Sequence, residues 1–245
     1  MSQSMLPVAI LAGGLATRLR PTTLTIPKSL VDVDGEPFIG RQLRLLAANR
    51  IDRAVVCAGY LGTMIEEFVR DGSRYGLRVD FSFDGSRLLG TAGALKRASP
   101  LLGDSFFVLY GDSYVPCDFA TVQQRFFESG KPALMTVFRN EGRFDASNVK
   151  YLDGSILAYD KRKPTPDMRH IDYGLGVLSQ QTMSSVPTGE AYDLADLYRA
   201  LIGKGEVAAC EISERFYEIG SANGLAETIR YFESQRHQAA NALRE

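Results

Sequence analysis

The chain has 245 residues, of which 45% are hydrophobic and 23% charged, and its formal net charge is −1. This length is enough to bury a sizeable core, and the balanced charge lacks the basic excess of nucleic-acid-binding proteins, so we expect no nucleic-acid partner. Three cysteines without C-x-x-C spacing indicate neither a disulfide framework nor a zinc site, which fits a cytoplasmic protein. No apolar run approaches the ~20 residues that cross a bilayer, so we expect no membrane partner.

The first half of the chain alternates apolar runs with segments of helical spacing. The runs predict strands, most of them buried on both faces, and the segments between them predict helices. The strands are Pro7–Leu11, Ala54–Ala58, Leu77–Phe83 and Phe106–Tyr110, and the helices are Phe38–Asn49, Gly62–Arg70, Thr91–Ala98 and Asp118–Glu128. Such alternation is typical of a mostly parallel sheet covered by helices on both faces. Ligands of such sheets bind at the carboxyl ends of the strands.

The pattern changes after Lys131. Turn residues such as Asp153-Gly154 separate short runs of strand character. The predicted strands are Ala133–Arg139, Val149–Leu152, Ser155–Tyr159 and Ile171–Leu178, followed by helices at Asp193–Leu201 and Ala222–His237. We interpret the strands as a small β-rich insertion, mixed or antiparallel, that forms a wall of the pocket. With no repeat or linker, we expect residues 1–245 to form a single domain.

A glycine loop follows the first predicted strand. Leu11-Ala12-Gly13-Gly14 leads to Thr17 and Arg18, and Pro27-Lys28 comes shortly after. The glycines free backbone N–H groups to approach an anion, while Arg18 and Lys28 add two positive charges at the same strand end. The spacing matches neither the Walker loop nor the dinucleotide-binding glycine motif. A glycine pair alone is more often a structural turn, but this order of residues favours a cradle for a triphosphate.

Two carboxylates are candidate metal ligands. Asp112 lies just past a buried strand, and Gly111 before it leaves room for a ligand. Mg²⁺ is commonly held by one or two protein carboxylates together with substrate phosphates. The alternative for Asp112 is a residue that caps the following turn. Glu218, between aromatic and aliphatic neighbours before a Gly-Ser turn, is the candidate second ligand, and its alternative is a solvated charge at a strand end.

Two further segments carry binding candidates. Leu89-Gly90-Thr91-Ala92-Gly93-Ala94 is a glycine turn suited to a flat nucleobase, with Asp84 or Ser86 as contacts to the base edge. It is equally well explained as a helix start capped by Thr91. In the basic cluster Asp160–Pro164, Lys161 or Lys163 would neutralise a second phosphate, although such clusters are more often solvated surface.

Together these motifs resemble those of the sugar-1-phosphate nucleotidyltransferases, also called nucleotide-sugar pyrophosphorylases. The resemblance covers nearly the whole chain in order and rests on Gly13-Gly14-x-x-Thr17-Arg18-Leu19-x-Pro21 with Pro27-Lys28, the base-binding turn Leu89–Ala94, the metal-binding pair Gly111-Asp112, Arg162-Lys163-Pro164 for Glu-Lys-Pro, and Phe216–Ser221 for aromatic-x-Asp-x-Gly-Thr. The compact length is similar to the branches of heptose- or mannose-1-phosphate guanylyltransferases and of muramic-acid-1-phosphate uridylyltransferases.

Three positions depart from the pattern of that family. Glu218 stands where the family has Asp, which lengthens the arm to a metal by one methylene. No Glu precedes Lys163, and Asp160-Lys161 offers a competing register. The segment His170-Ile171-Asp172-Tyr173-Gly174 replaces the usual Asn-x-Gly sugar contact, which suggests an unusual acceptor.

The resemblance implies a Rossmann-like α/β fold, with a mostly parallel mixed sheet, helices on both faces and a β-rich acceptor-binding insertion. Residues 1–130 would bind the nucleotide and residues 131–245 the sugar phosphate. The implied reaction is NTP plus sugar 1-phosphate giving NDP-sugar plus pyrophosphate with Mg²⁺, with a heptose or hexose guanylyl product for surface polysaccharides. In this reaction Arg18 would bind the leaving phosphates, and Lys28 would bridge the α-phosphate and the acceptor. Asp112 and Glu218 would bind the metal, and Lys161 or Lys163 would bind the acceptor phosphate. The sugar would be recognised near Asp172, Gly174 and Glu190.

Two other functions stay open at this point. One is cytidylyl or uridylyl transfer to another phosphorylated acceptor, such as phosphocholine or a phosphonate. The other is a non-catalytic sensor of sugar nucleotides, against which Arg18, Lys28 and Asp112 argue, because a binding module need not keep a metal ligand. Members of the family often form dimers or tetramers, so the resemblance also allows a homo-oligomer.

Overall fold

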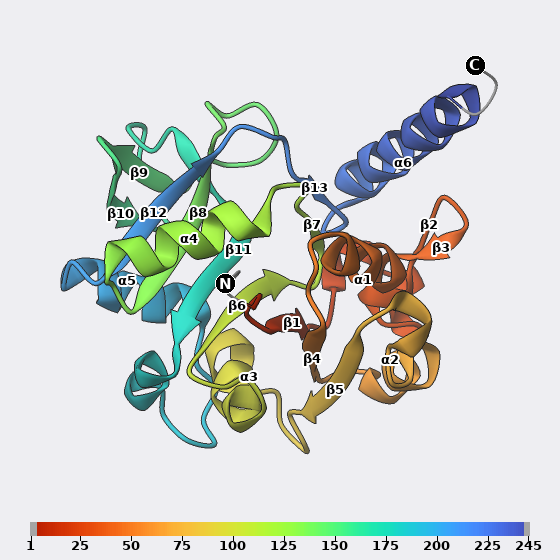
Figure 1. Cartoon of the computed structure of the whole chain (residues 1–245), viewed down its shortest axis with the longest axis horizontal. Helices are drawn as coiled ribbons and strands as arrows, with labels where there is room; N and C mark the ends of the chain where they lie inside the picture. The colour runs from red at the N-terminus through yellow and green to blue at the C-terminus, as the bar shows by residue number, and fades with distance from the viewer. Residues whose placement is uncertain (1–3, 243–245) are drawn as a thin grey trace.

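The computed structural model describes residues 4–242, and one large mixed sheet dominates this part of the chain (Figure 1). Its nine strands are β1 (Val8–Ala12), β4 (Arg53–Ala58), β5 (Arg78–Phe83), β6 (Ser105–Tyr110), β8 (Ala133–Arg139), β9 (Val149–Leu152), β10 (Ser155–Tyr159), β11 (His170–Ser179) and β12 (Val207–Ile212). Their order is β10-β9-β11-β6-β1-β4-β5, with β8 pairing β11 and β12. Two short pairs lie outside it: β2 (Asp32–Val33) with β3 (Glu36–Pro37), and β7 (Ser113–Tyr114) with β13 (Tyr217–Glu218).

Helices cover both faces of the sheet. They are α1 (Phe38–Ala48), α2 (Gly62–Val69), α3 (Gly90–Ala98), α4 (Phe119–Ser129), α5 (Leu194–Gly203) and α6 (Ala222–Ala242). Side chains of a strand alternate between faces, and β1 shows this directly: Val8 and Ile10 pack in the core with α1, α2 and α4, whereas Ala9 packs in the core with α3 and α5. The predicted α/β class, with helices on both faces of a mixed sheet, is confirmed.

The strands of the first half run parallel, as predicted. β1 lies between β4 and β6, and β5 pairs with β4, all in parallel register. The strands after Lys131 extend this same sheet: β11 is antiparallel to both β6 and β8, and β12 is parallel to β8. Strands from both halves thus share one sheet.

The predicted elements are observed, with ends displaced by a few residues. The strand β12 and the pairs β2–β3 and β7–β13 were not predicted from the sequence. β12 reads Val-Ala-Ala-Cys-Glu-Ile, and alanines carry little strand preference. The members of the two small pairs are two residues long, too short to show any periodicity. One of these pairs, β7–β13, proves central to the candidate site.

The carboxyl ends of β1 and β6 lie side by side. The Gly111 N–H donates to the Leu11 carbonyl at 3.1 Å, and a Cβ on Gly111 would collide with that carbonyl oxygen. The missing side chain therefore lets the glycine loop after β1 and Asp112 after β6 reach the same edge. Within residues 4–242, none of the helices is both long and apolar enough to cross a membrane.

α6 starts beside this edge and projects away from the body of the molecule (Figure 1). Its first turns are anchored by Phe232, which is buried in a small core with Val33, Phe38 and Ile219. Farther along, Arg236 pairs with Asp34 at 2.8 Å. The base of α6 is thus fixed to the β2–β3 hairpin and α1.

Candidate active site

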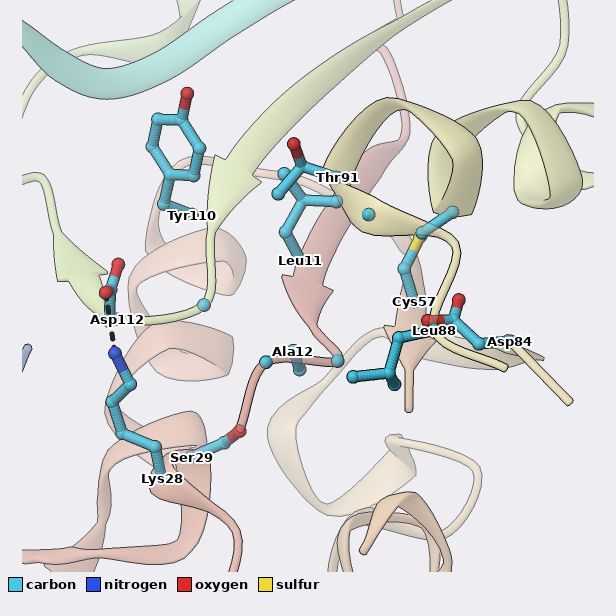
Figure 2. Close-up of a pocket in the computed structure, with 15 residues that line it drawn as sticks. Leu11, Ala12, Lys28, Ser29, Cys57, Asp84, Leu88, Thr91, Tyr110 and Asp112 are labelled. Carbon is cyan, nitrogen blue, oxygen red and sulfur yellow. Dashed lines mark hydrogen bonds and ion pairs between the residues drawn. The ribbon is translucent and has the colours of Figure 1, made fainter. Parts of the chain in front are cut away.

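Two cavities meet at the carboxyl ends of β1 and β6. The first, of about 240 Å³, is called here the glycine-loop cavity (Figure 2) and is lined by Leu11, Ala12, Gly13, Gly14, Lys28, Ser29, Cys57, Asp84, Leu88, Gly90, Thr91, Ala94, Tyr110, Gly111 and Asp112. The second, of about 290 Å³, is called the Asp172 cavity and is lined by Arg18, Tyr110, Asp112, Ser113, Asp145, Ala146, Asn148, Lys161, Pro164, Ile171, Asp172, Tyr173, Gly174, Phe216 and Glu218. Tyr110 and Asp112 belong to both.

Asp112 is surrounded by cations. Its Oδ2 is 2.7 Å from the Lys28 ammonium, the ion pair drawn in Figure 2. Burial raises the pKa of Asp112, but Lys28, with Lys161 and Arg18 farther off, outweighs burial and holds the pKa below its usual range. Asp112 is therefore ionised at neutral pH, and the positive charge around it is suited to phosphates from two substrates.

The β7–β13 pair brings Glu218 beside Asp112. Glu218 stands opposite Ser113 in the pair, and the Ile219 N–H donates to the Asp112 carbonyl at 2.9 Å. The Glu218 carboxylate accepts hydrogen bonds from the Gly220 N–H and, at 2.7 Å, from the Ser221 hydroxyl. The predicted second carboxylate thus lies at the site, close to the start of α6.

Gly220 shows how tightly these groups converge. A Cβ built on Gly220 would lie 2.5 Å from Glu218 Oε2, 3.0 Å from Arg18 Nη2 and 3.4 Å from Asp112 Oδ2. Two carboxylates and one guanidinium therefore surround a single backbone position. Arg18, expected near the glycine loop, lies on the side of the Asp172 cavity.

The carboxylate pair fits a hard divalent cation. In residues 4–242 no group of three or more His, Cys, Asp or Glu side chains is assembled for a metal, so the protein would supply only Asp112 and Glu218. Mg²⁺ keeps several waters and commonly binds through one or two carboxylates and substrate phosphates. Oxygen donors that converge from two segments are the ligand set that such a cation requires.

The glycine loop is open where an anion would approach. A Cβ on Gly14 would meet nothing within 4 Å, and Ala16 adopts a left-handed φ of 48° that turns the chain toward Arg18. Leu11, Ala12, Gly13 and Gly14 all line the cavity, as predicted, whereas Thr17 lines neither cavity. Ser29, which the sequence reading passed over, lines the cavity next to Lys28.

The second glycine turn has a larger structural role than the sequence suggested. Gly90 and Thr91 line the cavity, but Gly93 packs against the Glu190 carbonyl, where a Cβ would be 2.9 Å away. The capping alternative for Thr91 is wrong, because α3 starts at Gly90 without a side-chain cap. The Thr91 hydroxyl instead accepts from the Leu194 N–H at 2.7 Å, at the start of α5.

Asp84 lies at the back of the glycine-loop cavity. Its Oδ2 accepts from the Leu89 N–H at 3.1 Å, and its buried Oδ1 has no hydrogen-bond partner within the described part of the chain. Burial raises the pKa of Asp84. Cys57 lies in the same cavity, where burial and then Asp84 raise the pKa of its thiol to about 12. Cys57 is therefore a neutral lining group.

Lys161, rather than Lys163, lies in the Asp172 cavity. Its ammonium is 3.2 Å from Asp172 Oδ2 and 3.1 Å from the Tyr110 hydroxyl. Gly174 also lines this cavity, at a φ of 96°. Glu190 and Lys163 line neither cavity, so the geometry does not support their predicted substrate contacts.

Tyr110 and Tyr159 were missed by the sequence reading. Both hydroxyls donate to Asp172 Oδ2, at 3.1 and 2.8 Å. Tyr110 stood directly before the Gly111-Asp112 pair, at the carboxyl end of a buried strand, and its position was a usable signal. Tyr159 carried none, because only the fold places the end of β10 beside β11.

Comparison with known proteins identifies relatives whose activities fit this fold and this site. The model of a family described as nucleotidyl transferase matches residues 8–145. The chain is 29% identical over 239 residues to a UTP–glucose-1-phosphate uridylyltransferase of Synechocystis sp., covering 90% of this chain and 62% of the relative. It is 29% identical over 238 residues to the mannose-1-phosphate guanylyltransferase catalytic subunit beta of Xenopus tropicalis, covering 94% and 65%.

A solved structure shares the fold over nearly the whole chain. The crystal structure of HddC from Yersinia pseudotuberculosis has a TM-score of 0.72 and 25% identity, and the match covers 93% of this chain and 100% of that one. The chain spans slightly less than two thirds of the length of the two curated relatives. With the family model matching more than half of its residues, this chain belongs to the nucleotidyl transferase family.

Proposed function

We propose that the protein is a sugar-1-phosphate nucleotidyltransferase that converts an NTP and a sugar 1-phosphate into an NDP-sugar and pyrophosphate. The observation that carries this proposal is the pair of cavities that share Tyr110 and Asp112. One substrate would enter each cavity, and their phosphates would meet at Asp112, where Lys28, Arg18 and Lys161 supply positive charge. The activities named for the two curated relatives, uridylyl and guanylyl transfer to hexose 1-phosphates, support the same reaction class.

The chemistry requires positioning more than proton transfer. An oxygen of the sugar phosphate attacks the α-phosphorus and pyrophosphate leaves in line, and this oxygen is already an anion, so no general base is needed. Lys28 would bridge the α-phosphate and the acceptor, and Arg18, on the side of the Asp172 cavity, would add positive charge where the phosphates of the two substrates meet. The acceptor phosphate would bind Lys161. Mg²⁺, held by Asp112 and Glu218, would supply further charge neutralisation at the reacting phosphates.

We further propose guanine as the base, on the chemistry of Asp84. This residue lines the glycine-loop cavity, and an aspartate carboxylate offers only acceptors. Guanine alone among the common bases presents two adjacent donors, N1–H and N2–H, on its Watson–Crick edge, whereas uracil presents one donor between two carbonyls. A site built to pair with a donor rejects analogues that lack it by large factors.

The acidic lining of the Asp172 cavity supports a neutral sugar, a hexose or a heptose. Asp145 and Glu218 line the cavity, and the Lys161 charge is already paired with Asp172. Arg18 and Lys161 lie in the same cavity, but the proposed reaction uses both for phosphates, so an acceptor with its own carboxylate would meet repulsion from Asp145 and Glu218. Neutral hydroxyl groups, in contrast, can donate to these carboxylates.

The test is a matrix of four NTPs against sugar 1-phosphates, with Mg²⁺ and pyrophosphate release as the readout. The panel includes glucose, mannose, heptose and N-acetylmuramate 1-phosphates, together with phosphocholine as a non-sugar acceptor. We expect the highest kcat/KM for GTP with a neutral sugar. Turnover confined to phosphocholine, or none with any pair, would contradict the reaction class, whereas a wild-type preference for UTP would contradict only the proposed base.

A further inference from the structure

Asp172 is the centre of a hydrogen-bond network in the wall of the Asp172 cavity. Its Oδ2 accepts from the hydroxyls of Tyr110 and Tyr159, at 3.1 and 2.8 Å, and is 3.2 Å from the Lys161 ammonium. Its Oδ1 accepts from the Gly174 N–H at 3.1 Å. The side chain is only 3% exposed. Each carboxylate oxygen has about two lone-pair sites, so the protein itself fills the acceptor capacity of Oδ2 and uses one site of Oδ1.

The network holds Lys161 in one orientation. The ammonium lies 4.2 Å above the centre of the Tyr110 ring, donates to the Tyr110 hydroxyl at 3.1 Å and pairs with Asp172. An ammonium has three N–H donors, and within residues 4–242 these two contacts are the polar ones made by Lys161. Its side chain is 39% exposed. One donor is thus left to point into the cavity toward an incoming anion.

A carboxylate is the only group of this size that fits the network. Tyr110, Tyr159, Lys161 and the Gly174 N–H all present donors to Asp172. An asparagine here would turn its NH₂ group toward one set of donors, and it would carry no charge to pair with Lys161. The aspartate at this position therefore matches the two tyrosines and the lysine around it.

We propose that Asp172 is a positioning residue, which holds the Lys161 ammonium for the phosphate of the acceptor and makes no contact with the sugar itself. This proposal rests on the function proposed above for the cavity. It differs from the direct sugar contact expected from the sequence, because the Asp172 side chain is almost fully buried and Tyr110, Tyr159 and Lys161 already surround its Oδ2. Burial lowers the pKa of Lys161, but Tyr110 and Asp172 outweigh burial and raise it, so the charge of Lys161 is retained in its pocket.

The first test measures how strongly Asp172 protects the Lys161 amine from chemical labelling, and it requires no enzymatic turnover. Acetic anhydride labels neutral lysine amines, and mass spectrometry gives the rate at each lysine. In Asp172→Asn, which is isosteric, we expect Lys161 to label about tenfold faster, because a hydrogen bond to a charged group has been lost. Lys28, whose ammonium pairs with Asp112, serves as the internal reference and should label at an unchanged rate.

Asp145→Asn is the matched control for this labelling. Asp145 also lines the cavity, but within residues 4–242 its carboxylate accepts a hydrogen bond only from the Ala146 N–H. Lys161 should label in Asp145→Asn as it does in the wild type. An unchanged Lys161 rate in folded Asp172→Asn would overturn the proposal, even if the protein proved to have another activity.

The second test separates positioning from direct contact by a double-mutant cycle. We expect Asp172→Asn to raise KM for the sugar 1-phosphate about tenfold and to leave KM for the NTP unchanged. In the Lys161→Met background the same substitution should change neither value by more than about twofold. A direct sugar contact predicts that the tenfold effect persists in that background, and a general loss of structure predicts a rise in both KM values. Either result would overturn the positioning role, whereas absence of wild-type turnover would contradict the proposed function and leave the labelling test decisive for Asp172.

Discussion

At the scale of single residues, the balance of charge around Asp112 decides what the site can bind. Lys28 lies 2.7 Å from Asp112, and Arg18 and Lys161 also lower the pKa of this carboxyl. Glu218 converges on the same point, so cations and carboxylates alternate at the junction of the cavities. A divalent cation and two phosphorylated substrates would compete for these same groups. The ion pair between Lys28 and Asp112 is therefore expected to open as substrates bind, and each partner would then contact substrate or metal.

Asp112→Asn tests this expectation. The amide keeps the shape of the side chain but cannot supply a charged ligand, and loss of one preorganised electrostatic contact commonly lowers the rate by ~10²–10³. We expect kcat for pyrophosphate release to fall by at least that factor, with a thermal midpoint within a few degrees of the wild type. Asp118→Asn is the control, because Asp118 caps α4 far from both cavities and asparagine is an equally good cap. Near-normal turnover in Asp112→Asn would remove Asp112 from the mechanism.

Cys57 gives a prediction about pH. Burial, aided by Asp84, raises its pKa to about 12, so the thiol stays protonated until the pH approaches that value. Only about 10⁻⁴ of the thiol is ionised at pH 8, and the thiolate is the form that iodoacetamide attacks. We expect Cys57 to label more slowly than the partly exposed Cys210 at pH 8, and its rate to rise about tenfold per pH unit up to pH 10.

Labelling of the unfolded chain provides the reference for Cys57, since all three cysteines should then react alike. A folded protein in which Cys57 reacts as fast as Cys210 would contradict the neutral buried thiol. It would also reopen a covalent role for this side chain, which the proposed direct transfer does not use.

At the scale of elements, the two-stranded β7–β13 pair does the most to assemble the site. β7 follows Asp112 directly, and β13 contains Glu218, so pairing of these two-residue strands joins carboxylates more than a hundred residues apart in the chain. The turn after β13 then passes so close to Glu218, Arg18 and Asp112 that a side chain at position 220 would displace the Glu218 carboxylate. The geometry of the site thus depends on the backbone between β13 and α6.

Gly220→Ala should therefore impair catalysis more than folding. The new methyl would displace the Glu218 carboxylate, whose Oε2 lies 2.5 Å from the Cβ position, and a misplaced ligand lowers the rate by about 10²-fold. Gly203→Ala is the matched control at the end of α5, where a Cβ would meet nothing within 4 Å, and it should be neutral or slightly stabilising. The readouts are kcat at saturating Mg²⁺ and the thermal midpoint. Equal activity in the two variants would show that Glu218 needs no fixed position.

At the scale of the whole molecule, alternation and motifs predicted the architecture better than they predicted contacts. The parallel strands, the helices on both faces and the meeting of Gly13-Gly14 with Asp112 follow from periodicity and from the rule that parallel strands share a ligand-binding edge. The Asp172 network did not follow, since Tyr110, Tyr159 and Lys161 come from different segments and meet only through the register of β11. Glu190 and Lys163 were selected by their place in the sequence, and the fold places both outside the cavities.

The shared sheet predicts that the nucleotide half cannot fold by itself. β6 is a central strand, with Phe107 opposite Val177 and Phe106 opposite Leu178 of β11. A fragment of residues 1–130 would lack β11, so it would expose an unpaired strand edge and large apolar side chains, each worth roughly 1.5–3 kcal/mol of burial. We expect this fragment to lack a cooperative thermal transition, and co-expression with residues 131–245 to restore both the transition and pyrophosphate release. The control is the full chain nicked at a protease site placed in the exposed loop of residues 141–146, which keeps every strand and should remain associated. A fragment of residues 1–130 that folds cooperatively alone would show that the two halves are separate domains joined at an interface.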